Sequence, residues 1–255
     1  MTQQKIEDAS VYYNRLGQSI TALRDWYQRT CLFATKIMEI EPRHAVPIAD
    51  TILRDGFTKR ELHHKIVLEA LVISLVKHLW DAGHANETLR LCYFEEKRLA
   101  SIFLNGLRGI DRKREIENLP QPEYTKDRPL TLGERRAIAR KPDRHMLKLA
   151  MRDPHPMVMT NLLENPRLTE DDIVFVASRR PASPESLSEI AVHPRFRGSR
   201  RLARALINNP ALRTNMALSL LPALDAPYLR ELLKNRTLNS LLRDAIDEIL
   251  SLRQK

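Results

Sequence analysis

Regularly spaced prolines dominate the second half of this 255-residue chain and limit what it can fold into. From residue 142 onward, seven of the ten prolines recur at intervals of 12–16 residues. Proline cannot continue an α-helix, and it moves the residue before it away from helical dihedral angles. The spacing therefore predicts a series of helices of about ten residues each. The prolines are Pro142, Pro154, Pro166, Pro181, Pro194, Pro210 and Pro222.

Helix-start signals lie between these prolines, at the positions where the proline spacing predicts that helices begin. Thr131 and Glu134 have the spacing of a capping box, in which both side chains satisfy free N–H groups at a helix start. Thr169 is followed by three acids, which the positive end of a helix dipole favours. Ser183 precedes a proline and an acid, an arrangement typical of the first helical turn.

Helices of this length are unstable alone in water and need neighbours. A regular series of them buries its apolar faces by stacking, with two helices in each repeat of roughly 24–29 residues. We therefore expect an all-α protein whose C-terminal part, residues 133–255, is an α-solenoid.

The segment NPRLTEDDIVFVASRRPASPESLSEIAVHP resembles the short repeats of the HEAT-like and leucine-rich-repeat-variant families. Those repeats join short helices by Asn-Pro or Asp-Pro turns followed by a capping residue and acids. The resemblance covers about residues 133–252 and implies a helical solenoid that serves as an interaction platform. Some HEAT-like proteins of similar size and basicity are DNA glycosylases. The matching dipeptides are Asp153-Pro154, Asn165-Pro166, Arg180-Pro181 and Asn209-Pro210.

The first part of the chain, residues 1–118, predicts a separate helical domain. Apolar residues recur there at helical spacing, and Thr58 and Glu61 have the capping-box pattern. We expect a four-helix unit that packs or forms homo-oligomers. Three prolines and little apolar periodicity indicate a linker over residues 119–132. The helical segments expected in the first domain are 8–40, 44–54, 58–82 and 86–106.

Composition excludes several other classes. Seven glycines and few aromatic residues argue against an all-β fold and against Gly-rich nucleotide-binding loops. Two cysteines, Cys31 and Cys92, cannot form a disulfide scaffold and favour a reducing compartment. The first twenty residues have no apolar signal-peptide core, and segment 58–82 is too short for a membrane span. We expect a cytoplasmic bacterial protein.

Catalytic motifs do not stand out in this sequence. It has no Gly-rich phosphate loop, no His-Glu-x-x-His and no Gly-x-Ser-x-Gly. His63 and His64 are adjacent, so on a helix their side chains point about 100° apart and do not readily share a metal ion. We expect no cofactor, no metal site and no enzymatic activity, although an enzyme site that the sequence does not reveal stays an alternative.

Positive charge gathers in the second half, where residues 127–255 carry +8 of the total net charge of +10. No acid occurs between Glu189 and Asp225. On a helix that begins near Gly198, four of the arginines in this gap share one face. The arginines that we expect to bind an anionic partner are Arg179, Arg180, Arg195, Arg197, Arg200, Arg201 and Arg204.

Two fates of these arginines stay open. Acids of a neighbouring repeat, from Glu170 to Asp172 or at Glu185 and Glu189, would neutralise them as an inter-repeat ladder. Otherwise they bind an external anion: an acidic protein surface, nucleic-acid phosphate or an anionic membrane surface. We expect a non-enzymatic protein–protein interaction scaffold with an acidic partner. The alternative is a nucleic-acid-binding protein, resembling the DNA-repair glycosylases, although the basic half has few aromatic residues for base stacking.

Overall fold

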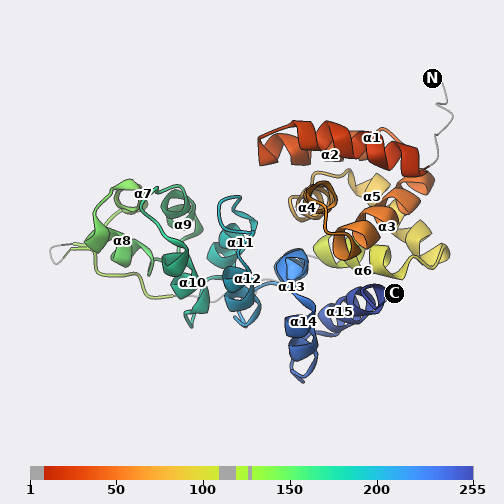
Figure 1. The fold of residues 1–255 in the computed structure, drawn as a ribbon. Helices are drawn as coiled ribbons and strands as arrows, with labels where there is room; N and C mark the ends of the chain where they lie inside the picture. Colours follow the sequence, from red (N-terminus) through yellow and green to blue (C-terminus); the bar gives the residue numbers. More distant parts are fainter. Residues whose placement is uncertain (1–8, 109–118, 126–127, 255) are drawn as a thin grey trace. The chain divides into compact units, whose positions relative to one another are not determined.

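The structure, a computed structural model, describes residues 9–108, 119–125 and 128–254. These residues form fifteen α-helices and one short 3₁₀ helix without any β-strand, which confirms the all-α prediction (Figure 1). The chain divides into two compact units, residues 1–110 with 225–255 (unit 1) and residues 111–224 (unit 2). No helix in the described ranges has both the length and the apolar character needed to cross a bilayer.

At the centre of unit 1 lies α4, which contacts α1, α2, α3 and α6. Ten of its fifteen positions are buried, most of them within the apolar run from Ile66 to Val76, because a helix segment that is apolar on most sides must be enclosed by others. The helices of unit 1 are α1 (Ala9–Ala22), α2 (Trp26–Met38), α3 (Pro42–Thr58), α4 (Leu62–Val76), α5 (Ala82–Phe94), α6 (Arg98–Arg108), α14 (Ala226–Leu233) and α15 (Ser240–Leu252).

Unit 1 has more helices than the four expected. The segment 8–40 is two helices, because the Asp25 side chain caps α2 by accepting a hydrogen bond from the Gln28 N–H at 2.8 Å. The segment 86–106 likewise divides between α5 and α6. The capping box expected at Thr58 is wrong: Thr58 ends α3 and donates to the Arg54 carbonyl, while α4 begins after Glu61. Residues 109–118 of the expected N-terminal domain lie outside the described residues.

The last two helices, α14 and α15, belong to unit 1 and not to unit 2. α15 packs against α3 and α6, and it buries Ala245, Ile246 and Ile249 completely. The Arg253 Nε donates to the carbonyl of Phe57 at 3.0 Å. The expected solenoid over 133–255 therefore differs from the observed grouping, because an apolar helix face packs against any complementary surface and its sequence does not specify which.

Unit 2 consists of short helices in two rows (Figure 1). In one row α7 contacts α9, α9 contacts α11 and α11 contacts α13. In the other row α10 contacts α12, and α8 lies against α7 and α9. This serial packing is what a helical repeat produces. The helices are α7 (Leu132–Arg140), α8 (Arg144–Ala150), α9 (Pro156–Leu163), α10 (Glu170–Ser178), α11 (Pro184–Val192), α12 (Arg200–Ile207), α13 (Thr214–Leu220) and the 3₁₀ helix η1 (Leu221–Ala223).

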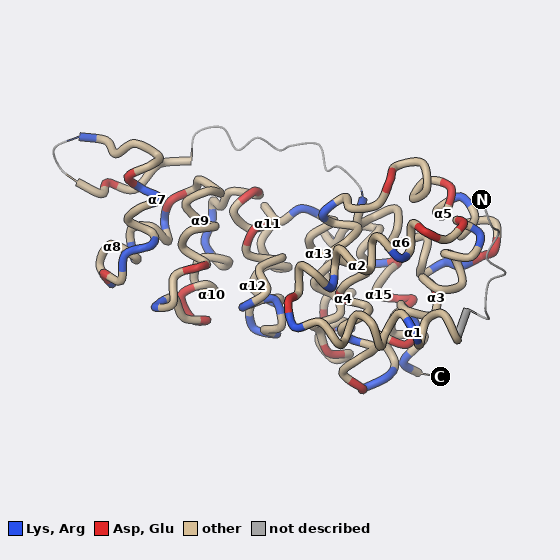
Figure 2. The backbone as a smooth tube through the Cα atoms, turned by 90° about the horizontal axis from the view of Figure 1, so that it is seen from above, with Lys and Arg blue, Asp and Glu red and all other residues tan. Residues whose placement is uncertain are grey.

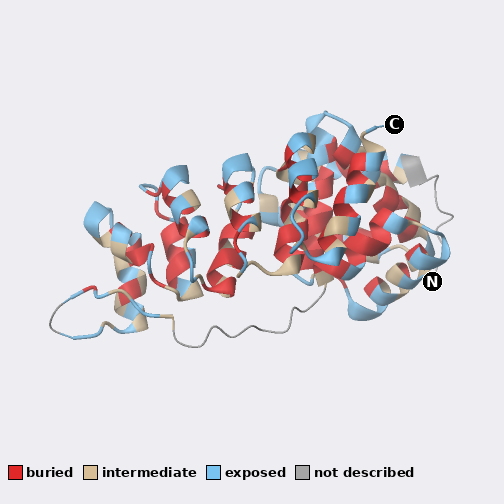
Figure 3. Ribbon diagram, turned by 90° about the horizontal axis from the view of Figure 1, so that it is seen from below, coloured by how far each residue is buried: buried red, intermediate tan, exposed pale blue. Residues whose placement is uncertain are grey.

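The expected helix starts of unit 2 are present. Thr131 and Thr169 each form a reciprocal capping box, with Glu134 and with Asp172. The Ser183 hydroxyl accepts from the backbone N–H three residues later, and proline follows it at the first helical position. Each helix buries one side and exposes the other, as Figure 3 shows. Local capping therefore sets where each helix begins, and one apolar stripe per helix provides the face that packs within the rows.

The asparagines that precede proline explain why the repeat uses Asn-Pro turns. Asn165, which is 2% exposed, donates through Nδ2 to the carbonyls of Ala139 (2.8 Å) and Lys141 (2.9 Å) at the end of α7. Its Oδ1 accepts from the N–H two residues later, which closes its own turn. Asn209 does the same with Ala177 and Arg179 at the end of α10. One amide thus joins two successive helices of a row.

Replacing Asn165 by alanine is expected to destabilise unit 2 by about 2 kcal/mol, because the buried carbonyl of Ala139 and the partly buried carbonyl of Lys141 lose their hydrogen-bond donor. The free energy of unfolding in urea measures this. The matched control is Asn235→Ala: the Asn235 side chain is exposed and accepts only from Thr237. Equal losses in the two variants would contradict the role of the buried amide.

Candidate functional site

Acids at the start of α10, marked along the backbone in Figure 2, pair with arginines of α8 and α12. Arg144 of α8 binds Asp172 with two hydrogen bonds of 2.7 and 2.6 Å. This guanidinium is the main reason why the pKa of Asp172 falls to about 2. On the other side Arg201 of α12 pairs with Asp171 at 2.8 Å. The inter-repeat ladder therefore exists for part of the arginine cluster.

Three of the seven candidate arginines bind backbone carbonyls of neighbouring turns. Arg195 donates to the carbonyls of Asn165, Pro166 and Leu168 at 2.7–3.3 Å. Arg179 donates to the Met151 carbonyl at 3.1 Å, and Arg180 donates to the Asn208 carbonyl at 2.5 Å. Each bond joins positions 27–30 residues apart in the sequence. These side chains hold successive repeats together.

The four remaining arginines do not share one helix face. Ser199 caps α12, which begins at Arg200, so Arg197 lies in the preceding turn and the expected face of four residues is wrong. Burial lowers the pKa of Arg197 to about 9, which still leaves the side chain charged at neutral pH. Arg200, Arg201 and Arg204 are exposed on α12, opposite the buried Leu202 and Leu206. We call these three residues the α12 arginines.

A buried ion pair at the beginning of unit 2 was missed by the sequence analysis. Arg135 of α7 donates through Nη1 to both carboxylate oxygens of Asp153, at 2.9 and 2.8 Å. The Tyr124 hydroxyl donates to the same carboxylate at 2.8 Å. All three residues are at most 7% exposed. The segment expected to be a free linker is therefore tied to unit 2 through Tyr124, a lone aromatic residue among prolines.

His63 and His64 of α4 converge, contrary to the expectation that they diverge. Their ring centroids lie 3.7 Å apart, and Glu61, His63 and His64 each place a potential metal-ligand atom within 4.8 Å of the others. The buried His64 already uses both nitrogens: Nδ1 bonds the Tyr13 hydroxyl, and Nε2 lies 2.9 Å from Glu61. A helix start also disfavours a cation. The cluster thus fits a structural network better than a metal site.

The two cysteines are free thiols in the structure. Cys92 is fully buried, and burial raises its pKa to about 12. Because the thiolate is the reactive form, this side chain is a poor nucleophile at neutral pH. Cys92 therefore packs in the core of unit 1, and Cys31 on α2 is partly buried.

Comparison of the chain with protein-family models, with curated proteins and with solved structures finds no match. The resemblance to HEAT-like and leucine-rich-repeat-variant repeats is therefore supported only at the level of a helical repeat fold.

Replacing Asp153 by asparagine is expected to destabilise unit 2 by about 3–5 kcal/mol, because buried Arg135 loses its counter-charge. Tyr124→Phe removes one hydrogen bond to a charged acceptor and is expected to cost about 1.5–3 kcal/mol. Urea unfolding measures both losses. In the control Tyr93→Phe the side chain is exposed, so a change below about 0.5 kcal/mol is expected. A Tyr124→Phe protein as stable as this control would show that the tie is dispensable.

Acid is expected to weaken unit 1 through His64. Burial and the neighbouring His63 lower its pKa below 6.5, with Lys59 acting in the same direction and Asp55 and Glu61 opposing them. The unfolded chain then binds the proton more tightly, so stability is full above about pH 6.5 and is lost as the pH falls through the lowered pKa. Urea midpoints between pH 7.5 and 5 should fall less steeply in His64→Gln than in the control His145→Gln. Parallel curves would refute the assignment.

Proposed function

We propose that this protein is a non-enzymatic interaction scaffold that binds an acidic protein surface through the α12 arginines. The observation that carries the proposal is that α12, with the sequence RRLARALI, exposes three arginines and contains no acid. A guanidinium binds a carboxylate through two parallel hydrogen bonds, so a row of exposed arginines favours acidic side chains as ligands.

The inter-repeat acids leave these arginines able to exchange partners. The side chains of Arg201 and Asp171 are 65% and 75% exposed, and an ion pair so open to water stabilises a protein by at most about 1 kcal/mol. An incoming carboxylate can therefore replace Asp171 at little cost. Arg179, Arg180 and Arg195 are needed between repeats, so the proposed binding set narrows to Arg200, Arg201 and Arg204.

Nucleic-acid binding is the alternative, since phosphate contacts would use the same charges. The aromatic residues of unit 2 argue against it. Unit 2 has three of them, of which Tyr124 and Phe196 are buried and only Phe175 is half-exposed. Single-stranded nucleic acids are bound by stacking successive bases on several exposed rings. Unit 2 offers only one exposed ring, that of Phe175.

Self-association through the N-terminal helices and a cytoplasmic, bacterial setting stay predictions.

The variant R200A/R201A/R204A is expected to bind poly-L-glutamate about tenfold more weakly than the natural protein, because three guanidinium contacts are lost. Fluorescence anisotropy of labelled poly-L-glutamate at several salt concentrations measures the affinity. The control K141A/K148A/R167A removes the same charge from exposed positions of unit 2.

An equal loss of affinity in the control variant would show that net charge, and not α12, determines binding. The nucleic-acid alternative would replace the proposal under two conditions. The natural protein would fail to bind poly-L-glutamate, and it would bind a 20-base-pair DNA duplex with an affinity that depends on the α12 arginines.

A further inference from the structure

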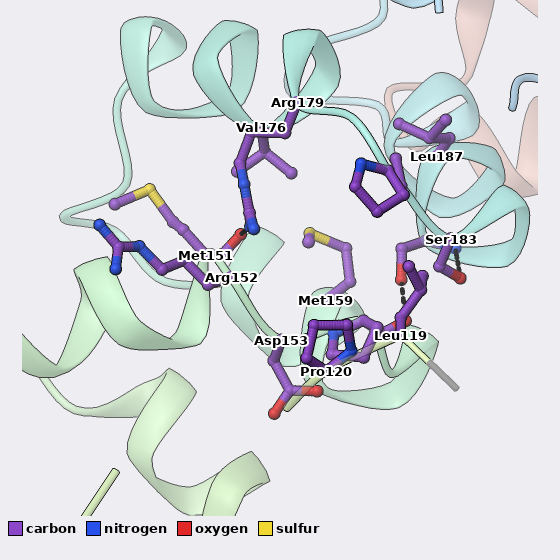
Figure 4. A pocket seen from close by; sticks show the side chains of 14 residues that line it. Leu119, Pro120, Met151, Arg152, Asp153, Met159, Val176, Arg179, Ser183 and Leu187 are labelled. Atoms are coloured by element: carbon purple, nitrogen blue, oxygen red, sulfur yellow. Dashed lines mark hydrogen bonds between the residues drawn. The ribbon is translucent and has the colours of Figure 1, made fainter. Parts of the chain in front are cut away.

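A small pocket opens on the edge of unit 2 where the α8–α9 and α10–α11 connections lie side by side (Figure 4). Its inner surface is apolar and consists of Met151, Met159, Val176 and Leu187, all of them buried. The space is about 80 Å³. Ligand pockets for metabolites are usually about 300–1,000 Å³, so this pocket suits a single side chain.

Two arginines flank this apolar surface. Arg152 is exposed, and Arg179 extends from the end of α10 toward Met151, whose carbonyl it binds (Figure 4). Burial lowers the pKa of Arg179, and the like charge of Arg152 lowers it further. No acid of the described residues forms an ion pair with either side chain. Because two neighbouring guanidinium groups repel each other, a carboxylate placed between them would be stabilised.

The chain itself lays an extended segment along the same pocket. Leu119 and Pro120 form part of its wall (Figure 4). Tyr124 ties their segment to unit 2 through its hydrogen bond to the buried Asp153. This segment has no helical structure, and the side chain of Leu119 is half-buried. The edge of unit 2 therefore accommodates extended backbone with an apolar side chain turned toward it.

We propose that this pocket binds an extended acidic peptide, which inserts one apolar side chain while the exposed Arg152 binds an adjacent carboxylate. The pocket proposal rests on the proposed function, because both take the partner to be an acidic protein. The pocket, however, uses residues other than the α12 arginines. A peptide fits better than a nucleic acid, because the lining of the pocket contains no aromatic ring on which a base could stack.

The experiment uses a fluorescein-labelled peptide of sequence GSEELEEGS and a second peptide in which serine replaces the leucine. Burying the leucine side chain contributes about 1.5–3 kcal/mol, so the leucine peptide is expected to bind at least about tenfold more tightly. Fluorescence anisotropy with the full-length protein measures both affinities. Equal affinities for the two peptides would overturn the proposal.

Two variants of the protein localise the peptide. Ala182→Leu fills the pocket from its half-exposed rim and is expected to weaken binding of the leucine peptide about tenfold without changing that of the serine peptide. Arg152→Ala removes one carboxylate contact and should weaken both peptides by about fivefold. The control Arg167→Ala, an exposed arginine elsewhere in unit 2, should change neither. Urea midpoints verify that all three variants fold.

The two proposals can fail separately. If R200A/R201A/R204A abolishes peptide binding while Ala182→Leu and Arg152→Ala leave it intact, the pocket proposal is wrong and the proposed function stands. If poly-L-glutamate fails to bind but the leucine peptide binds in an Ala182-dependent way, the pocket proposal stands and the α12 arginines are not the site. Duplex DNA is added as a competitor to the natural protein and to the Ala182→Leu variant. If it displaces the peptide equally well from both, the pocket proposal is overturned.

Discussion

The buried asparagine of each Asn-Pro turn is the interaction on which unit 2 depends. A helix end leaves its last carbonyls without intrahelical donors, and short helices have many such ends for their length. Asn165 and Asn209 satisfy two of these carbonyls in the previous helix of the same row while closing their own turns. The following proline removes a backbone donor and ends the helix. One dipeptide thus terminates one helix and attaches it to another.

Arginine performs the same task where asparagine is absent. The turn after α11 has no Asn-Pro, and there Arg195 reaches across to three carbonyls of the turn after α9. Arg179 does so for the turn after α8. An arginine can serve here because its guanidinium carries five donors and no acceptor. Much of the arginine enrichment of unit 2 therefore has a structural cause, and a binding role is left to side chains that remain exposed, above all the α12 arginines and Arg152.

The segment before α7 shows how a buried ion pair confers specificity on a stretch without secondary structure. Taking Arg135 and Asp153 out of water is expensive, and the pair is tolerable because Tyr124 and a backbone N–H complete the hydrogen bonding of the carboxylate. The same carboxylate belongs to an Asp-Pro turn. One residue thus both closes a repeat turn and fixes the preceding chain segment against it.

The sequence by itself determined the local structure of this protein. Proline spacing and capping residues such as Thr131, Thr169 and Ser183 predicted where the helices of unit 2 begin, because these signals act within one turn of the chain. The sequence also suggested, as one alternative, that acids near Asp171 neutralise the arginine cluster that includes Arg201. It gave no sign that Arg195 would bind backbone carbonyls. Only the tertiary structure decided that α15 packs with unit 1, that Arg197 is partly buried, and that Tyr124 reaches Asp153. These contacts join residues far apart in the chain, and no local pattern specifies which of several complementary surfaces an apolar face or a charged side chain will meet.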